Sequence, residues 1–112
     1  MTDKYDKYGN PIDLEQWAKL FEDEKYKRIG LDKLWWGANV STVWLGLDHS
    51  FETNVPLFYE TMVFFLGHDI DINRYGGLAD ARNGHIHMIQ KWSKPSNAVR
   101  AILRRLKKGG RT

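Results

Sequence analysis

Asp48, His49 and Glu60 are the residues whose types and spacing best suit chemistry. The pair Asp48-His49 precedes a polar connection, and Glu60 follows in the next apolar run. A carboxylate beside a histidine, facing a second carboxylate, suits general acid–base catalysis and is also half of a metal site. In the alternative interpretation Asp48 caps the turn, His49 is polar surface, and Glu60 bonds a neighbouring side chain. We favour this alternative and expect a protein that is not an enzyme.

A second pair of histidines, His85 and His87, is separated by one residue. On a helix these side chains point about 200° apart, so they cannot ligate one metal from the same face. The apolar positions that follow continue a helical spacing, and we expect His85 to be a half-buried packing residue. The chain has no cysteine and no glycine motif of the kind that binds phosphates. We therefore predict no metal site and no cofactor.

The distribution of charge points to a partner. Residues 1–80 hold 8 Lys and Arg against 14 Asp and Glu, a net charge of −6, whereas residues 81–112 hold 9 Lys and Arg and no acid. Residues 97–108 predict an amphipathic helix with an apolar stripe and a basic remainder. Its basic positions are Arg100, Arg104, Arg105, Lys107 and Lys108.

This basic face is suited to a phosphate backbone, and neutralising five phosphates of duplex DNA gives a log–log salt slope of roughly −4 to −5. Two alternatives stay open. The apolar stripe can dock on the body and leave the arginines solvated, or the basic face can meet an acidic protein surface. No run of the chain approaches the roughly 20 apolar residues of a membrane span, and the N-terminus does not resemble a signal peptide. We expect a cytoplasmic protein without a membrane partner.

Four aromatic residues form the other candidate contact surface. Trp35 and Trp36 are adjacent, and Trp44 and Tyr59 lie in two separate apolar runs. If Trp44 and Tyr59 share the face turned away from the helices, they form an exposed apolar patch, which is typical of a protein-binding surface. The alternative is that these rings belong to the core.

Capping and periodicity define the predicted elements. Asp13 and Gln16 form a capping box for a helix that ends near Glu24, and residues 26–36 predict a short strand or irregular edge. Residues 40–47 and 57–65 predict an antiparallel hairpin with a wide loop. Further predicted elements are a short edge strand at 69–72, a helix at 78–94 and the basic helix at 97–108.

These elements predict an α+β fold in the order α-(β)-β-β-α-α, with helices on one face of an antiparallel sheet of two to three strands. At 112 residues the chain is expected to form one domain, with residues 1–11 and 109–112 flexible. We place Val43, Leu45 and Leu47 on the core face, the alternative being that Trp44 points inward. So small a sheet is compatible with a homodimer that extends or covers it.

The segment Val40 to Phe51, VSTVWLGLDHSF, is followed by a strand ending in ETMVF and by a helix containing Gly84-His85. This pattern resembles a group of small uncharacterised proteins encoded by bacteriophages, which share the first block, an FETMVF-like strand and a Gly-His in a helix. Tyr59 departs from the second block, and the basic helix lies outside the pattern. The resemblance implies a phage origin and an accessory role, and it implies no catalytic residue.

Together these observations give three functional hypotheses. The first is a non-enzymatic phage-type accessory protein that binds and modulates or inhibits a host macromolecule in the host cytosol, for example a host defence nuclease complex. The second is a nucleic-acid-binding protein that uses the basic helix. The third is a small enzyme centred on Asp48, His49 and Glu60.

Overall fold

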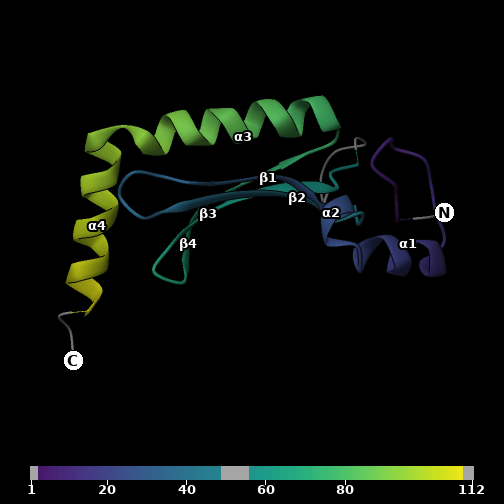
Figure 1. Ribbon diagram of the computed structural model, residues 1–112, viewed down its shortest axis with the longest axis horizontal. Helices are drawn as coiled ribbons and strands as arrows, with labels where there is room; N and C mark the ends of the chain where they lie inside the picture. The colour runs from purple at the N-terminus through teal and green to yellow at the C-terminus, as the bar shows by residue number, and fades with distance from the viewer. Residues whose placement is uncertain (1–2, 49–55, 110–112) are drawn as a thin grey trace.

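A computed structural model describes residues 3–48 and 56–109, except for the side chain of Lys108. Helices precede and follow a four-stranded antiparallel sheet (Figure 1). The elements are α1 (Leu14–Phe21), α2 (Glu24–Lys27), β1 (Arg28–Lys33), β2 (Asn39–Trp44), β3 (Tyr59–Phe65), β4 (His68–Tyr75), α3 (Leu78–Ser93) and α4 (Pro95–Gly109). The predicted α+β class is confirmed, but the sheet has four strands rather than two to three.

The two edge strands account for the difference. β1 has the sequence RIGLDK and β4 the sequence HDIDINRY, and most of their residues are exposed. Edge strands carry charged side chains because one backbone edge faces solvent, so their apolar alternation is weak. For this reason the pattern of residues 26–36 does not distinguish a strand from an irregular edge. The strand predicted at 69–72 covers only part of β4.

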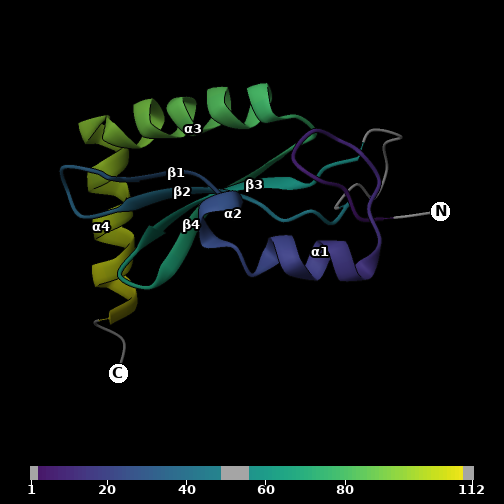
Figure 2. The same ribbon diagram turned by 45° about the vertical axis from the view of Figure 1, so that its right-hand side comes forward.

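The strands follow the chain order β1-β2-β3-β4, and each neighbouring pair is antiparallel. α3 lies across one face of this sheet in both views (Figures 1 and 2). Val40, Thr42 and Trp44 of β2 point into the core and are fully buried. The assignment of Val43 to the core face was thus wrong, and the alternative with Trp44 inward is the one that holds. The indole ring of Trp44 and the β-branched side chains of Val40 and Thr42 fill the space beneath α3.

The core under α3 consists of two apolar clusters separated by polar side chains. One cluster contains Val40, Val63 and Met88, and the other contains Trp44 and Tyr59. Between them, the register pairs Thr42 with Thr61. This polar layer contacts α3 through His85.

The start of the chain is attached to the second cluster. The indole of Trp44 donates to Tyr5 O at 2.9 Å, the hydroxyl of Tyr59 donates to Lys7 O at 2.5 Å, and the amide of Lys7 donates to the Tyr26 hydroxyl. We expected residues 1–11 to be a flexible lead-in, and this stays a prediction. Residues 3–11 supply polar partners to Trp44, Tyr59 and Tyr26. Residues 1–2 and 110–112 lie outside the described residues.

α1 begins as predicted, because Asp13 and Gln16 form both hydrogen bonds of the capping box. It ends at Phe21 rather than near Glu24, since Asp23 caps the separate short helix α2. α4 begins at Pro95, two residues before the predicted start. Proline suits the first position of a helix because that residue needs no amide donor.

Candidate functional site

Four side chains join the sheet to α3 in a continuous chain of hydrogen bonds. Thr61 Oγ1 lies 2.5 Å from Thr42 Oγ1, which lies 2.7 Å from His85 Nδ1. His85 Nε2 lies 2.7 Å from Asp32 Oδ2. A hydroxyl, an imidazole and a carboxylate in series are the components of a nucleophilic triad.

The solvent accessibility of these four side chains shows whether they can act on a substrate. Thr42 and Thr61 are fully buried between the sheet and α3, so no substrate atom can approach their hydroxyl groups. Asp32, by contrast, is 55% exposed at its side chain. The arrangement therefore satisfies buried polar groups between the sheet and α3. His85 is the packing histidine that the sequence predicted, although it is more deeply buried than expected.

The predicted acid–base residues have structural partners. Asp48 Oδ1 accepts a hydrogen bond from the amide of Leu57 at 3.0 Å, which links the two ends of the β2–β3 connection. Glu60 accepts from Arg74 Nε at 3.0 Å across β3 and β4. These are the roles of the alternative interpretation. His49 lies outside the described residues.

The predicted aromatic surface requires a correction. Trp44 and Tyr59 are fully buried, so they cannot contact a partner. They are turned toward α3 because they share the strand face of Val40 and Val63.

Trp35 and Trp36 hold the C-terminal end of α3. Trp35 Nε1 donates to Ser93 O at 3.0 Å, and Trp36 Nε1 donates to Trp92 O at 2.7 Å. The last four carbonyls of a helix lack intrahelical donors, so these indoles act as side-chain caps. Trp36 is half-buried, whereas Trp35 stays 66% exposed.

α4 meets the β3–β4 turn at a pocket of about 320 Å³ that contains the predicted basic residues. Both views show α4 running from the end of α3 past this turn (Figures 1 and 2). Arg100, Arg104 and Arg105 line the pocket from α4, and Phe65 and Trp92 add aromatic rings. We call this site the arginine pocket. Its remaining lining residues are His68, Asp69, Ile70, Lys91, Asn97 and Ala101.

The charges of the arginine pocket are unbalanced. None of its three arginines forms an ion pair within the described part of the chain. Lys91 is neutralised by Asp71, whose carboxylate lies 2.8 Å from Lys91 Nζ and also accepts from Trp92 Nε1 at 2.9 Å. Burial raises the pKa of Asp71, but these hydrogen bonds outweigh it and leave the pKa below its usual value. Asp71 does not itself line the pocket. Among the described lining residues Asp69 is the only acid, and it faces three arginines.

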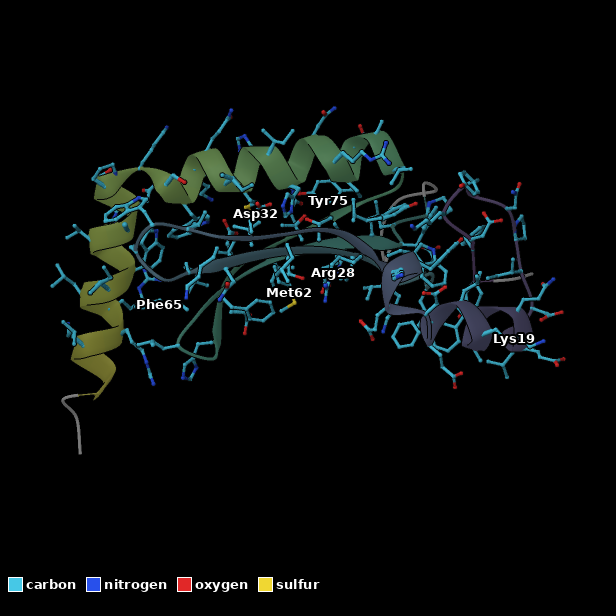
Figure 3. The ribbon with its side chains drawn as sticks, in the orientation of Figure 1. Lys19, Arg28, Asp32, Met62, Phe65 and Tyr75 are labelled. Atoms are coloured by element: carbon cyan, nitrogen blue, oxygen red, sulfur yellow. The ribbon has the colours of Figure 1, made fainter. Side chains whose placement is uncertain are left out.

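The sheet face opposite α3 adds further basic residues. No helix of the described chain lies across this face (Figures 1 and 2). Arg28 and Met62 point away from α3, whereas Asp32 and Tyr75 point toward it (Figure 3). The β-bulge between Arg28 and Gly30 shifts the alternation of β1 by one residue. Lys33, which pairs with Asn39, therefore lies on the same face as Arg28, which pairs with Val43.

Comparisons with protein-family models, curated proteins and solved structures give no significant match to this chain. The resemblance to bacteriophage proteins therefore stays a prediction. Within the described ranges no helix is long and apolar enough to cross a membrane. The same ranges contain no group of three or more His, Asp or Glu side chains suited to a metal ion.

Sequence reasoning identified the basic side chains of the site but not its location. Phe65, His68 and Trp92 reach the pocket from β3, the β3–β4 hairpin and α3, and no spacing along the chain connects them. The polar layer was missed for a similar reason, because Asp32 and Thr42 belong to strands whose register only the folded sheet defines. Exposed Lys107 lies outside the pocket lining, and the side chain of Lys108 is outside the described part.

Proposed function

We propose that this protein is a non-enzymatic accessory protein that binds nucleic acid through the arginine pocket. The observation that supports this proposal is the set of three arginines without ion-pair partners that line one pocket together with two aromatic rings. Guanidinium groups bind phosphate oxygens in a bidentate geometry, and aromatic rings stack on bases. At about 320 Å³ the pocket has room for one nucleotide-sized group.

The remaining basic surface extends this contact. Arg28 and Lys33 on the uncovered face can add phosphate contacts beyond the pocket. Such binding does not depend on sequence, because phosphate contacts position the nucleic acid but do not read its bases. The proposed role is thus general binding rather than recognition of a specific site.

Fluorescence anisotropy with short labelled single-stranded DNA, duplex DNA and RNA tests the proposal over a series of salt concentrations. We expect wild-type affinity to fall steeply with salt. In Arg100→Gln/Arg104→Gln the affinity should drop about tenfold or more, and the log–log slope should decrease by about 1.4 for single strands and 1.8 for duplex DNA. Both arginines are exposed, so the fold should be retained.

Lys19→Gln/Arg82→Gln is the matched control, because it removes the same charge from α1 and from the end of α3 distant from α4. This control should bind like wild type. Equal losses of affinity in both double variants would show that only the net charge of the protein matters, and not the arginine pocket. Binding by wild type that does not depend on salt would also contradict the proposal.

A host protein or nucleoprotein is the second candidate partner, and the exposed indole of Trp35 favours it. Tryptophan is enriched at protein interfaces and dominates their energetics. Affinity capture from a host lysate with wild type and Trp35→Ala should recover a shared partner with wild type only. Identical recoveries would exclude Trp35 as the contact.

A further inference from the structure

The charges and the rings of the arginine pocket differ in their exposure. Arg100 and Arg104 are exposed, and their i, i+4 spacing places them side by side on α4. Phe65 and Trp92 line the same pocket and are half-buried. We call these two rings the aromatic wall. A ligand that fits this division carries an anionic group at the rim and a flat ring further in, as a single nucleotide does.

The aromatic wall is held in place without a ligand. Phe65 lies beside α4 (Figure 3) and packs against Trp36, with the ring centroids 4.8 Å apart. Trp36 Nε1 donates to Trp92 O at 2.7 Å, and Trp92 Nε1 donates to Asp71 at 2.9 Å. A ring that is already ordered loses little entropy when a ligand stacks on it. The wall is therefore preorganised for a flat ligand.

Of the two rings, Phe65 is the better stacking surface. The ammonium group of Lys91 lies 5.5 Å from the centroid of the Trp92 ring, and Asp71 holds that ammonium group at 2.8 Å. A cation in this position competes with a base for the ring. No cation of the described residues lies over the Phe65 ring. The base of a bound nucleotide is thus best placed on Phe65.

We propose that the arginine pocket receives one unpaired nucleotide, with its base on Phe65 and its phosphate at Arg100 and Arg104, so that the protein prefers single-stranded nucleic acid to duplex. This inference rests on the proposed function and specifies the form of nucleic acid that the pocket takes. A base of a duplex enters a pocket only after it leaves its pair and its stack, which is unfavourable. A base of a single strand avoids most of this penalty.

Electrostatics alone would give the opposite preference. Duplex DNA has the higher charge density, and each phosphate contact with it releases more counterions than a contact with a single strand. A basic surface that touches only phosphates therefore binds the duplex at least as tightly. Tighter binding of the single strand is thus a signature of base stacking and not of charge.

Fluorescence anisotropy of the full chain at one fixed salt concentration tests this preference. The labelled DNA probes have equal length and are a thymidylate single strand, a duplex, and a strand of abasic residues that keeps the phosphates but offers no base. We expect wild type to bind the single strand about tenfold more tightly than either of the others. Equal binding of the single and abasic strands, or tighter binding of the duplex, would overturn the inference.

Phe65→Leu tests the stacking surface, because it removes the ring and keeps an apolar side chain of similar size. Its affinity for the single strand should fall about fivefold or more, with little change for the duplex and the abasic strand. Tyr8→Leu, which removes an exposed ring (78%) before α1, should bind every probe like wild type. An unchanged single-strand affinity of Phe65→Leu, with an unchanged circular dichroism spectrum, would overturn the placement of the base.

Competition by small molecules tests the pocket in wild type, so it does not depend on the folding of any variant. Thymidine monophosphate should displace the labelled single strand at a concentration about tenfold lower than deoxyribose 5-phosphate does, because only the former supplies a base. Equal displacement by the two compounds would show that the pocket binds the phosphate alone, and would overturn the inference.

Arg100→Gln/Arg104→Gln separates this inference from the proposed function. If this variant loses affinity for every probe while wild type binds the single and abasic strands equally, the proposed function holds and the inference fails. If the variant binds every probe like wild type, the arginine pocket is not the binding site, and both fail.

Discussion

At the scale of single residues, the contact between Gly30 and His85 sets how closely α3 approaches the sheet. A Cβ at position 30 would lie 2.7 Å from His85 Nε2 and 2.9 Å from two ring carbons. Only a residue without a side chain leaves the imidazole room to reach both Thr42 and Asp32. The polar layer therefore requires glycine at position 30. This requirement comes from His85 of α3 and not from the residues next to Gly30 in the sequence.

Gly30→Ala should displace His85 and lower the free energy of unfolding by about 1–3 kcal/mol, since it crowds the ring and leaves buried polar groups unpaired. Urea denaturation measures this loss. Ser41→Ala, a change on the uncovered face of β2, should have an effect below about 0.5 kcal/mol. Wild-type stability of Gly30→Ala would show that the ring can shift without cost.

Tyr59 should make the protein sensitive to alkali. Burial, followed by the nearby Tyr26 and Asp6, raises the pKa of its phenol well above the usual value. The folded state then keeps a proton that the unfolded chain releases near pH 10, so the stability due to this group is present below about pH 10 and falls as pH rises further.

Unfolding free energies measured on both sides of about pH 10 test this dependence. Tyr59→Phe should be less stable at neutral pH, because it loses the bond to Lys7 O, and it should lose stability less steeply in alkali. Tyr8→Phe, at an exposed position (78%) whose charge contributes less to the pKa of Tyr59 than Tyr26 and Asp6 do, should change the slope less than Tyr59→Phe does. Equal slopes for all three proteins would contradict the assignment.

At the scale of secondary-structure elements, Asp71 joins β4 to the last turns of α3. Its carboxylate accepts hydrogen bonds from Lys91 and Trp92, and Trp92 in turn packs near Trp36 and lines the arginine pocket. The position of the pocket's aromatic wall thus depends on one acid of an edge strand. Among the described side chains of α4, only Ala98 is fully buried.

Asp71→Asn should weaken this junction and remove part of the acid sensitivity of the fold. Because the pKa of Asp71 is lowered in the folded state, its contribution is present above about pH 4 and is lost as pH falls through the folded value. Chemical denaturation at neutral and acidic pH should show a smaller decrease for the variant than for wild type. Asp69→Asn, at an exposed position, should follow wild type.

At the scale of the whole molecule, the charges separate along the longest axis of the structure, which extends 47 Å. Residues 3–24 hold seven acids and three lysines, whereas α4 holds five basic residues and no acid. α1, where Figure 3 labels Lys19, and α4 lie at opposite ends. An anionic partner should therefore approach with its charge directed at α4.

Neutralising the acidic end tests this orientation, given the proposed nucleic-acid binding. Glu15→Gln/Glu22→Gln should increase the association rate with DNA by less than about threefold at 0.01 M salt, where the Debye length is near 30 Å, and not at 0.15 M. Stopped-flow fluorescence measures these rates. An equal gain at both salt concentrations would indicate a direct contact rather than long-range repulsion.

The sequence by itself determined those features that depend on neighbouring residues. The capping box of α1, the hairpin of β2 and β3, the stop between α3 and α4 and the basic face of α4 all follow from local spacing and charge. The structure bears out each of these elements within one to three residues. The acidic body and basic C-terminal region are likewise properties of the chain itself.

Tertiary structure decided which face of each strand is buried and where the basic residues lie. Both faces of β2 carry apolar residues, so alternation could not choose between Val43 and Trp44, and α3 settled the choice by covering the face with the larger rings. The arginine pocket exists because the end of α3 turns α4 toward the β3–β4 turn. Which strand face is buried, and which residues meet in the arginine pocket, depends on contacts between segments that are distant in the sequence. Local sequence patterns do not encode those contacts.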